Sequence, residues 1–122
     1  MKVILDTNFI ISCLRQKIQI FDEGYILIVP EEVISELRSI SRDKESKVKD
    51  RQVVELALEL INKNEVERVK LNLSEGEDVD SGLIKLAKKK GSVVASLDKK
   101  LREGFKEGRF LIIKGKKKLV FV

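Results

Sequence analysis

Short runs of aliphatic and β-branched residues alternate with longer segments of helical periodicity along the chain, and this alternation most constrains the fold. Short apolar runs bounded by turn residues are typical of buried strands. We predict strands at residues 2–5, 25–29, 66–71, 92–95 and 109–113, and another over 119–122. Strands that alternate with helices favour an α/β fold, with a mostly parallel central sheet covered on both faces.

Apolar residues at helical spacing fill the stretches between these runs. We predict helices from about residue 9 to 16, from Pro30 to about 40, over about 53–61, over 74–90 and over 98–106. Residues 41–49 are a charged connection that leads into a helix. Ser74 and Glu77 have the spacing of a capping box. Gly91 follows three lysines and provides a stop for the helix that they end.

The length of 122 residues fits a single domain over residues 1–122, and 43% hydrophobic residues indicate a globular core. No apolar run approaches the length of a membrane span. Met1 and Lys2 lead directly into a strand rather than a signal peptide, so we expect a cytoplasmic protein. Cys13 is the only cysteine and lies among aliphatic residues, which predicts a small core residue.

Histidine is absent from the whole sequence. This absence excludes Ser-His-Asp and Cys-His catalysis, histidine-ligated zinc and histidine acid–base chemistry. Any hydrolytic reaction must therefore use carboxylates, lysines, hydroxyls or a metal ion. The net charge of +5 and the pI near 9.3 suit a polyanionic partner such as nucleic acid, but charge alone favours the alternative of a soluble surface with a modest excess of lysine.

Two aspartates follow predicted strands. Asp6 comes directly after residues 2–5, and Asp98 comes shortly after residues 92–95. Ligands of open α/β sheets bind at the carboxyl ends of strands, so these two side chains are candidates for one site. The alternative is that each caps the helix that follows it.

Two further acids lie on predicted helices. Asp80 precedes Leu83, Ile84 and Ala87 at offsets of three, four and seven, which places its carboxylate on the apolar stripe. The alternative is a first-turn residue favoured by the helix dipole. Glu36 flanks the apolar face of its own helix, and the alternative there is a surface glutamate paired with Arg38 or Lys44.

Carboxylates packed together repel one another and need a cation. Oxygen ligands without nearby histidine or cysteine select Mg²⁺ or Mn²⁺. Such ions deprotonate water, stabilise charge at phosphorus and orient the leaving oxygen. The acidic set therefore predicts metal-dependent phosphodiester chemistry.

At this point the sequence resembles the PIN-domain nucleases. Four segments carry the resemblance, in order along nearly the whole chain: Val3-Ile4-Leu5-Asp6-Thr7-Asn8, Pro30-Glu31-Glu32-Val33-Ile34-Ser35-Glu36-Leu37, Asp78-Val79-Asp80 leading into Leu83-Ile84-Lys85-Leu86-Ala87, and Val93-Val94-Ala95-Ser96-Leu97-Asp98-Lys99-Lys100-Leu101. Each motif alone is weak, and their order makes the set specific.

The resemblance implies a three-layer α/β/α protein that cuts RNA with Mg²⁺ or Mn²⁺. It maps Asp6, Glu36, Asp80 and Asp98 onto the catalytic, metal-binding acids. Asn8 and Ser96 match the supporting polar positions of the family. At the position of Ser96, threonine is the more common residue. The resemblance also implies a homodimer. It is closer to ribosomal-RNA-processing nucleases than to type II toxins, so a ribosome-assembly partner and an antitoxin both stay open.

Other functions remain open at this stage. A PIN-like RNA-binding or assembly module with little turnover would have the same fold. A phosphatase or receiver domain would use Asp6 as a nucleophile or phospho-acceptor, but the second acid expected near it is missing. Lys88–Lys90 are explained by a helix end, and Lys114 and Lys116–Lys118 by a solvated turn, although the latter group also suits contacts to RNA phosphates.

Overall fold

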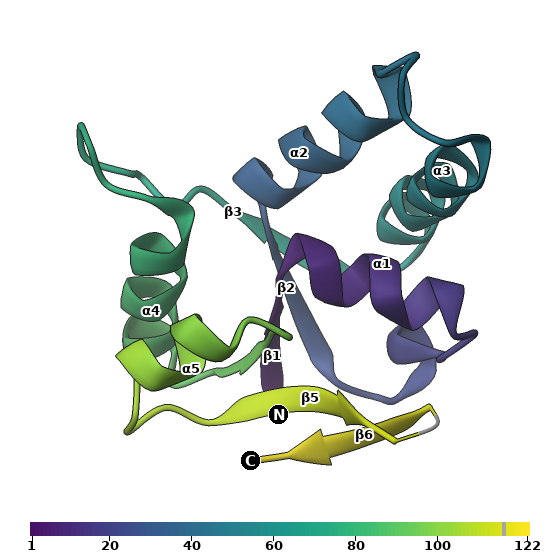
Figure 1. The fold of residues 1–122 in the computed structure, drawn as a ribbon. Helices are drawn as coiled ribbons and strands as arrows, with labels where there is room; N and C mark the ends of the chain where they lie inside the picture. Colours follow the sequence, from purple (N-terminus) through teal and green to yellow (C-terminus); the bar gives the residue numbers. More distant parts are fainter. Residues whose placement is uncertain (116) are drawn as a thin grey trace.

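A sheet with helices on both faces forms the centre of the computed structural model, which describes residues 1–115 and 117–122 (Figure 1). The strands are β1 (Lys2–Leu5), β2 (Ile26–Pro30), β3 (Val66–Val69), β4 (Val93–Ala95), β5 (Phe110–Lys114) and β6 (Lys118–Phe121). The helices are α1 (Thr7–Arg15), α2 (Glu31–Arg42), α3 (Val48–Lys63), α4 (Val79–Lys90) and α5 (Lys99–Gly104), with a 3₁₀ turn η1 (Ile20–Asp22). The predicted three-layer α/β/α fold is confirmed.

The strands follow the order β3-β2-β1-β4-β5-β6. All neighbouring pairs are parallel except β5 with β6, which are antiparallel. From β1 the chain builds outward through β2 to β3, and then returns to the other side of β1 to place β4. The order of strands therefore reverses between β1 and β4, and such a switch point is where open α/β sheets bind ligands.

The central strands are apolar on both sides because helices cover both faces of the sheet. Val3 and Leu5 of β1 pack in the core beneath α1, α2 and α3. Ile4, which lies between them, points to the opposite face and packs with α4 and α5. Cys13 is completely buried in the first of these cores, as predicted, and burial raises the pKa of its thiol to about 12.

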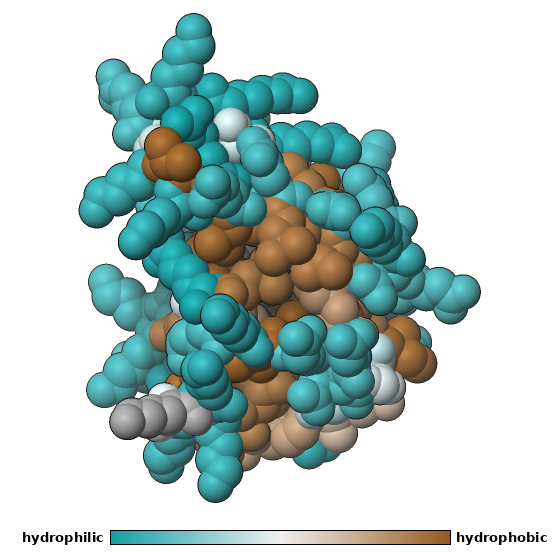
Figure 2. All heavy atoms as spheres, turned by 90° about the vertical axis from the view of Figure 1, so that its right-hand side faces the viewer, coloured by the Kyte–Doolittle hydropathy of each residue, from teal (hydrophilic) through white to brown (hydrophobic). Residues whose placement is uncertain are grey.

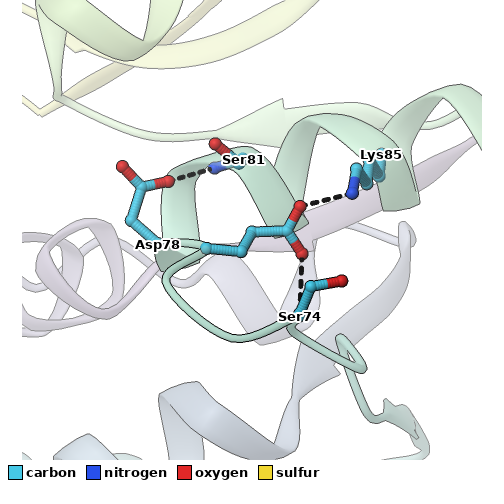
Figure 3. A network of polar contacts seen from close by, with 5 residues as sticks. Ser74, Asp78, Ser81 and Lys85 are labelled. Atoms are coloured by element: carbon cyan, nitrogen blue, oxygen red, sulfur yellow. Dashed lines mark hydrogen bonds and ion pairs between the residues drawn. The ribbon is translucent and has the colours of Figure 1, made fainter.

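The start of α4 differs from the prediction. Glu77 Oε1 accepts a 3.3 Å hydrogen bond from Ser74 N, which is one of the two bonds of a capping box. The helix does not begin there, however, because Ser74 and Glu77 form a separate turn, in which Glu77 N donates to Ser74 O at 2.9 Å. Gly76 has a φ of 78°, a left-handed conformation that interrupts a right-handed helix. Asp78 caps α4 instead by accepting a 2.8 Å hydrogen bond from Ser81 N (Figure 3).

Other boundaries shift by a few residues. The helix predicted from about 53 begins at Val48, and the strand predicted to reach Leu71 ends at Val69. Gly91 ends α4 with a φ of 62°, as its position predicts. The turn predicted around Gly115 includes Lys116, which lies outside the described residues. None of the described helices is long and apolar enough to cross a membrane.

Candidate active site

Asp6 and Asp98 lie at the switch point of the sheet. Leu5 of β1 pairs with Ala95 of β4, and Asp6 N continues this pairing with a 3.1 Å hydrogen bond to Ala95 O. Asp98 follows β4 by three residues and precedes α5. The two carboxylates therefore come from the carboxyl ends of adjacent parallel strands.

Ser96 connects these two aspartates. Its hydroxyl Oγ donates a hydrogen bond to Asp6 Oδ2 at 3.1 Å and accepts one from Asp98 N at 3.1 Å. The Ser96 side chain is completely buried, so water does not replace either contact. The structure thus places Ser96 where the resemblance expects a supporting hydroxyl.

Thr7 makes the corresponding connection between Asp6 and Glu36. Its backbone N donates to Asp6 Oδ1 at 2.8 Å, and its hydroxyl Oγ1 donates to Glu36 Oε2 at 3.0 Å. Thr7 is only 2% exposed, whereas Glu36 is an exposed residue of α2. Sequence reasoning missed Thr7 as a site residue. The available signal was a hydroxyl beside Asp6 at the start of a helix, which capping already explained.

Asp80 reaches the same group from the first turn of α4. Partial burial raises the pKa of its carboxyl, and the charges of Asp98, Asp6 and Asp78 raise it further, in that order. A hydrogen bond with Asp98 adds to this shift and favours a proton on Asp80. Asp80 is therefore close enough to both strand-end aspartates for their charges to act on it.

Burial also raises the pKa of Asp6, and the charges of Glu36 and Asp98 act in the same direction. The hydrogen bonds from Ser96 and Thr7 oppose this rise because they stabilise the carboxylate. Asp6 thus interacts with each of the other three predicted acids: Glu36 and Asp98 raise the pKa of Asp6, and Asp6 raises the pKa of Asp80. We refer to Asp6, Glu36, Asp80 and Asp98 as the acidic cluster.

Asp6 and Asp98 each cap a helix and also belong to the acidic cluster. Asp6 caps α1 with Oδ1 and receives Ser96 on Oδ2. Asp98 caps α5 by accepting hydrogen bonds from Lys100 N at 2.9 Å and Leu101 N at 3.4 Å. Asn8, the other residue expected to support the site, lies exposed on α1 and lines a hollow together with Ser12.

The donor set suits a hard divalent cation. Carboxylate and hydroxyl oxygens surround the switch point, and the chain contains no histidine. Burial raises the pKa values of Asp6 and Asp80, the neighbouring carboxylates raise them further, and a divalent cation would relieve this repulsion. Within residues 1–115 and 117–122, no three acidic or cysteine side chains are already gathered tightly enough to form a ready-made metal site.

Comparison with known proteins places the chain in a family. Residues 3–118 match the family model described as a PIN-like domain. The solved structure of the PIN domain endonuclease Utp24 is similar over 98% of this chain and 90% of that chain, with 24% identity and a TM-score of 0.76. A domain of a functionally unknown protein from Methanocaldococcus jannaschii DSM 2661 is similar over 98% and 95%, with 18% identity and a TM-score of 0.62.

At these identities the two solved structures establish a shared fold. No curated protein matches the sequence. The family model, by contrast, extends over nearly the whole chain and includes all four positions of the acidic cluster. The chain therefore belongs to the family of PIN-like domains, a family of nucleases.

Proposed function

We propose that this protein is an endoribonuclease that depends on Mg²⁺ or Mn²⁺ and hydrolyses phosphodiester bonds of RNA. The observation that carries the proposal is the convergence of four carboxylates at the switch point of a PIN-like fold. Phosphodiester hydrolysis without histidine requires another means of activating water and stabilising negative charge. Carboxylates that hold a divalent cation provide both.

Asp6, Asp80 and Asp98 would hold the cation, and Glu36 would contact it directly or through water. When bound, the cation would lower the pKa of a water molecule and neutralise charge on the phosphate. Ser96 and Thr7 fix the orientation of Asp6, because each of its two carboxylate oxygens accepts one hydrogen bond from them. Thr7 also holds Glu36 Oε2, so the second oxygen of Glu36 would orient the attacking water.

The surroundings of the cluster support a phosphate-containing substrate. Lys99 and Lys100 follow Asp98 directly and form the exposed first turn of α5. Lysines are unfavourable at this positive end of a helix, so helix stability does not account for them. Contacts to the phosphates on either side of the cleaved bond would account for them, and the net charge of +5 would attract RNA to the site.

The proposal also covers the RNA that the protein cleaves in the cell and its oligomeric state. The likeness to an endonuclease PIN domain supports internal cleavage of the RNA chain. We propose ribosomal-RNA processing as the first role to test, because the four sequence motifs resemble that group most, and toxin-like RNA cleavage as the second. We also propose a homodimer in the cytoplasm, with sedimentation at micromolar concentration as the test of its oligomeric state.

The decisive experiment compares Asp80→Asn with Asp78→Asn. Both substitutions remove one charge at the start of α4, but only Asp80 belongs to the acidic cluster. We expect Asp80→Asn to lose Mn²⁺-dependent cleavage of structured ribosomal fragments and unstructured RNAs while it keeps its fold. Asp78→Asn should cleave normally, because asparagine also caps a helix. Equal cleavage by Asp80→Asn and the wild type would contradict the proposed site.

A further inference from the structure

Two adjoining hollows lie along α1 and reach the start of α3. The first has a volume of about 490 Å³ and is lined by polar groups of Asn8, Ser12 and Ser46. The second has a volume of about 730 Å³ and is lined by Lys47 and Lys49. Both hollows are lined by Arg15 and Asp50, so they adjoin at this pair. We refer to the two together as the α1–α3 groove.

No residue of the acidic cluster lines the α1–α3 groove, but the groove approaches the cluster along α1, because its lining includes Asn8. Asn8 lies two residues after Asp6, and Asn8, Ser12 and Arg15 are spaced by four and three residues, which places them on one face of α1. The seven residues from Asn8 to Arg15 cover about 10 Å along the helix axis. That length suits about two nucleotides of an extended strand that leaves the cluster.

The α1–α3 groove and the segment that leads into α4 differ in charge. The segment that leads into α4 carries Glu75, Glu77, Asp78 and Asp80. Glu77 is paired with Lys85 of α4, and the remaining acids leave the segment with a net negative charge that would repel phosphates. The α1–α3 groove instead presents Arg15, Lys47 and Lys49, with Asp50 as its one acid. A polyanion bound at the acidic cluster would therefore extend toward α3 rather than over the start of α4.

The floor of the second hollow is apolar, with Leu14, Val53 and Leu56. Figure 2 shows the face that carries α3 and the C-terminal end of α1, where hydrophobic side chains form an area surrounded by hydrophilic ones. A floor of this kind accommodates unpaired bases while the cationic rim contacts phosphates. This combination favours a single strand, whose bases are accessible, over a duplex.

Arg15 and Asp50 form an ion pair where the two hollows meet. Arg15 lies in the last turn of α1 and Asp50 in the first turn of α3, so each charge also suits its own helix end. The Arg15 side chain is 52% exposed, and the guanidinium is therefore accessible to a phosphate from solvent. Asp50 competes with such a phosphate for Arg15.

We propose that the α1–α3 groove holds the single-stranded RNA on one side of the cleaved bond. Arg15, Lys47 and Lys49 contact its phosphates, and Asp50 weakens this binding by pairing with Arg15. The proposal rests on the proposed ribonuclease function and extends it to the path of the substrate. It assigns a binding role to residues outside the acidic cluster.

The test measures the affinity of a fluorescent oligouridine of about 12 nucleotides in EDTA, so that binding is read without cleavage. The triple variant Arg15→Gln, Lys47→Gln, Lys49→Gln is compared with Lys2→Gln, Lys89→Gln, Lys106→Gln. The control positions are exposed and line neither hollow: Lys2 begins β1, Lys89 lies in the last turn of α4, and Lys106 follows α5. We expect the groove variant to bind at least about tenfold more weakly and to lose about 2 from the slope of log K against log salt, and the control to change little.

A single substitution tests the competition at Arg15. Asp50→Asn should raise RNA affinity several-fold, because it releases Arg15 and removes the acid of the groove. The matched control is Glu107→Gln, which changes the net charge equally and releases Lys88 from its 3.7 Å ion pair far from the groove. A larger gain for Asp50→Asn than for Glu107→Gln supports the proposal.

Equal effects of the groove and control variants in both comparisons would overturn it, because binding would then follow net charge alone. If the groove triple variant and the control triple variant lose RNA affinity to the same extent, the proposal is also overturned. Cleavage by the wild type is measured separately with Mn²⁺. A wild type that binds RNA through the groove but never cleaves it would contradict the proposed function and leave the groove supported.

Discussion

Ser96 Oγ donates a hydrogen bond to Asp6 Oδ2 at 3.1 Å, although 90 residues separate the two in the sequence. The same oxygen accepts a hydrogen bond from Asp98 N at 3.1 Å. One buried hydroxyl therefore connects the ends of β1 and β4, which are the two strands on either side of the switch point. The position of both strand-end carboxylates depends on this residue.

Ser96→Ala should destabilise the protein by about 1–3 kcal/mol, because it removes a completely buried hydroxyl together with its hydrogen bonds to Asp6 and to Asp98 N. Ser92 is the matched control: it is also buried, just before β4, but its Oγ has no hydrogen-bond partner among the described residues. Ser92→Ala should therefore leave stability within about 0.5 kcal/mol of the wild type or raise it. Urea unfolding at pH 7 measures both variants. Equal losses would show that the two hydrogen bonds of Ser96 do not stabilise the fold.

Thr7→Val keeps the β-branched shape of a buried residue and removes only the hydroxyl that holds Glu36. We expect a stability loss of about 1 kcal/mol. Cleavage should fall by about tenfold to a hundredfold, because Glu36 would no longer be held in position. Thr7→Ser, which retains the hydroxyl, should recover most of the rate. Wild-type cleavage by Thr7→Val would mean that Glu36 needs no such positioning.

Local sequence patterns were sufficient for the class of fold. Residues 3–5 and 93–95 are uninterrupted apolar runs, and strands buried on both faces have this composition. The order of the strands was not predictable in the same way. The pairing of Leu5 with Ala95 joins segments far apart in the chain, and neither segment carries a local signal that specifies its partner.

The acidic residues were identified from their places on strand ends and on an apolar helix face, and the structure brings them together. Thr7 was missed because a hydroxyl at the start of a helix has the same local pattern whether it caps the helix or reaches another element. The packing role of Gly82 was not predicted either, because it depends on a contact with another segment of the chain. An added Cβ at Gly82 would approach Leu73 to 2.6 Å, so this glycine allows the connection before α4 to pack against the helix.

Asp80→Asn should stabilise the protein at pH 7 in EDTA. The pKa of Asp80 is raised in the folded state above its ordinary value of 3.8, so ionisation of Asp80 costs folding free energy. This cost is absent below pH 3.8 and appears as the pH rises through the raised pKa. The advantage of the variant should therefore be present at pH 7 and disappear near pH 4. Because Asp80 is partly exposed, we expect less than about 1 kcal/mol.

Asp78→Asn provides a control of opposite sign. Hydrogen bonds with Ser81 lower the pKa of Asp78, so its charged form stabilises the fold above its unfolded pKa. At pH 7 this variant should be slightly less stable than the wild type. Thermal melts of both variants at pH 4 and pH 7 make the comparison. A gain in Asp80→Asn that persists unchanged at pH 4 would show that ionisation of Asp80 is not its cause.

Mn²⁺ should stabilise the folded protein through the acidic cluster, because a ligand that binds only the folded state raises the free energy of unfolding by mass action. At a metal concentration about a hundred times the Kd, the expected gain is about 2.7 kcal/mol, and the Tm should rise with concentration. Asp98→Asn should lose most of this rise, since asparagine preserves the cap of α5 but contributes no charge. Glu75→Gln is the control, because Glu75 is an exposed acid outside the cluster. A Tm that is unchanged in millimolar MnCl₂ would show that the protein does not bind the metal. A rise of the same size in Asp98→Asn and Glu75→Gln would place metal binding outside the acidic cluster.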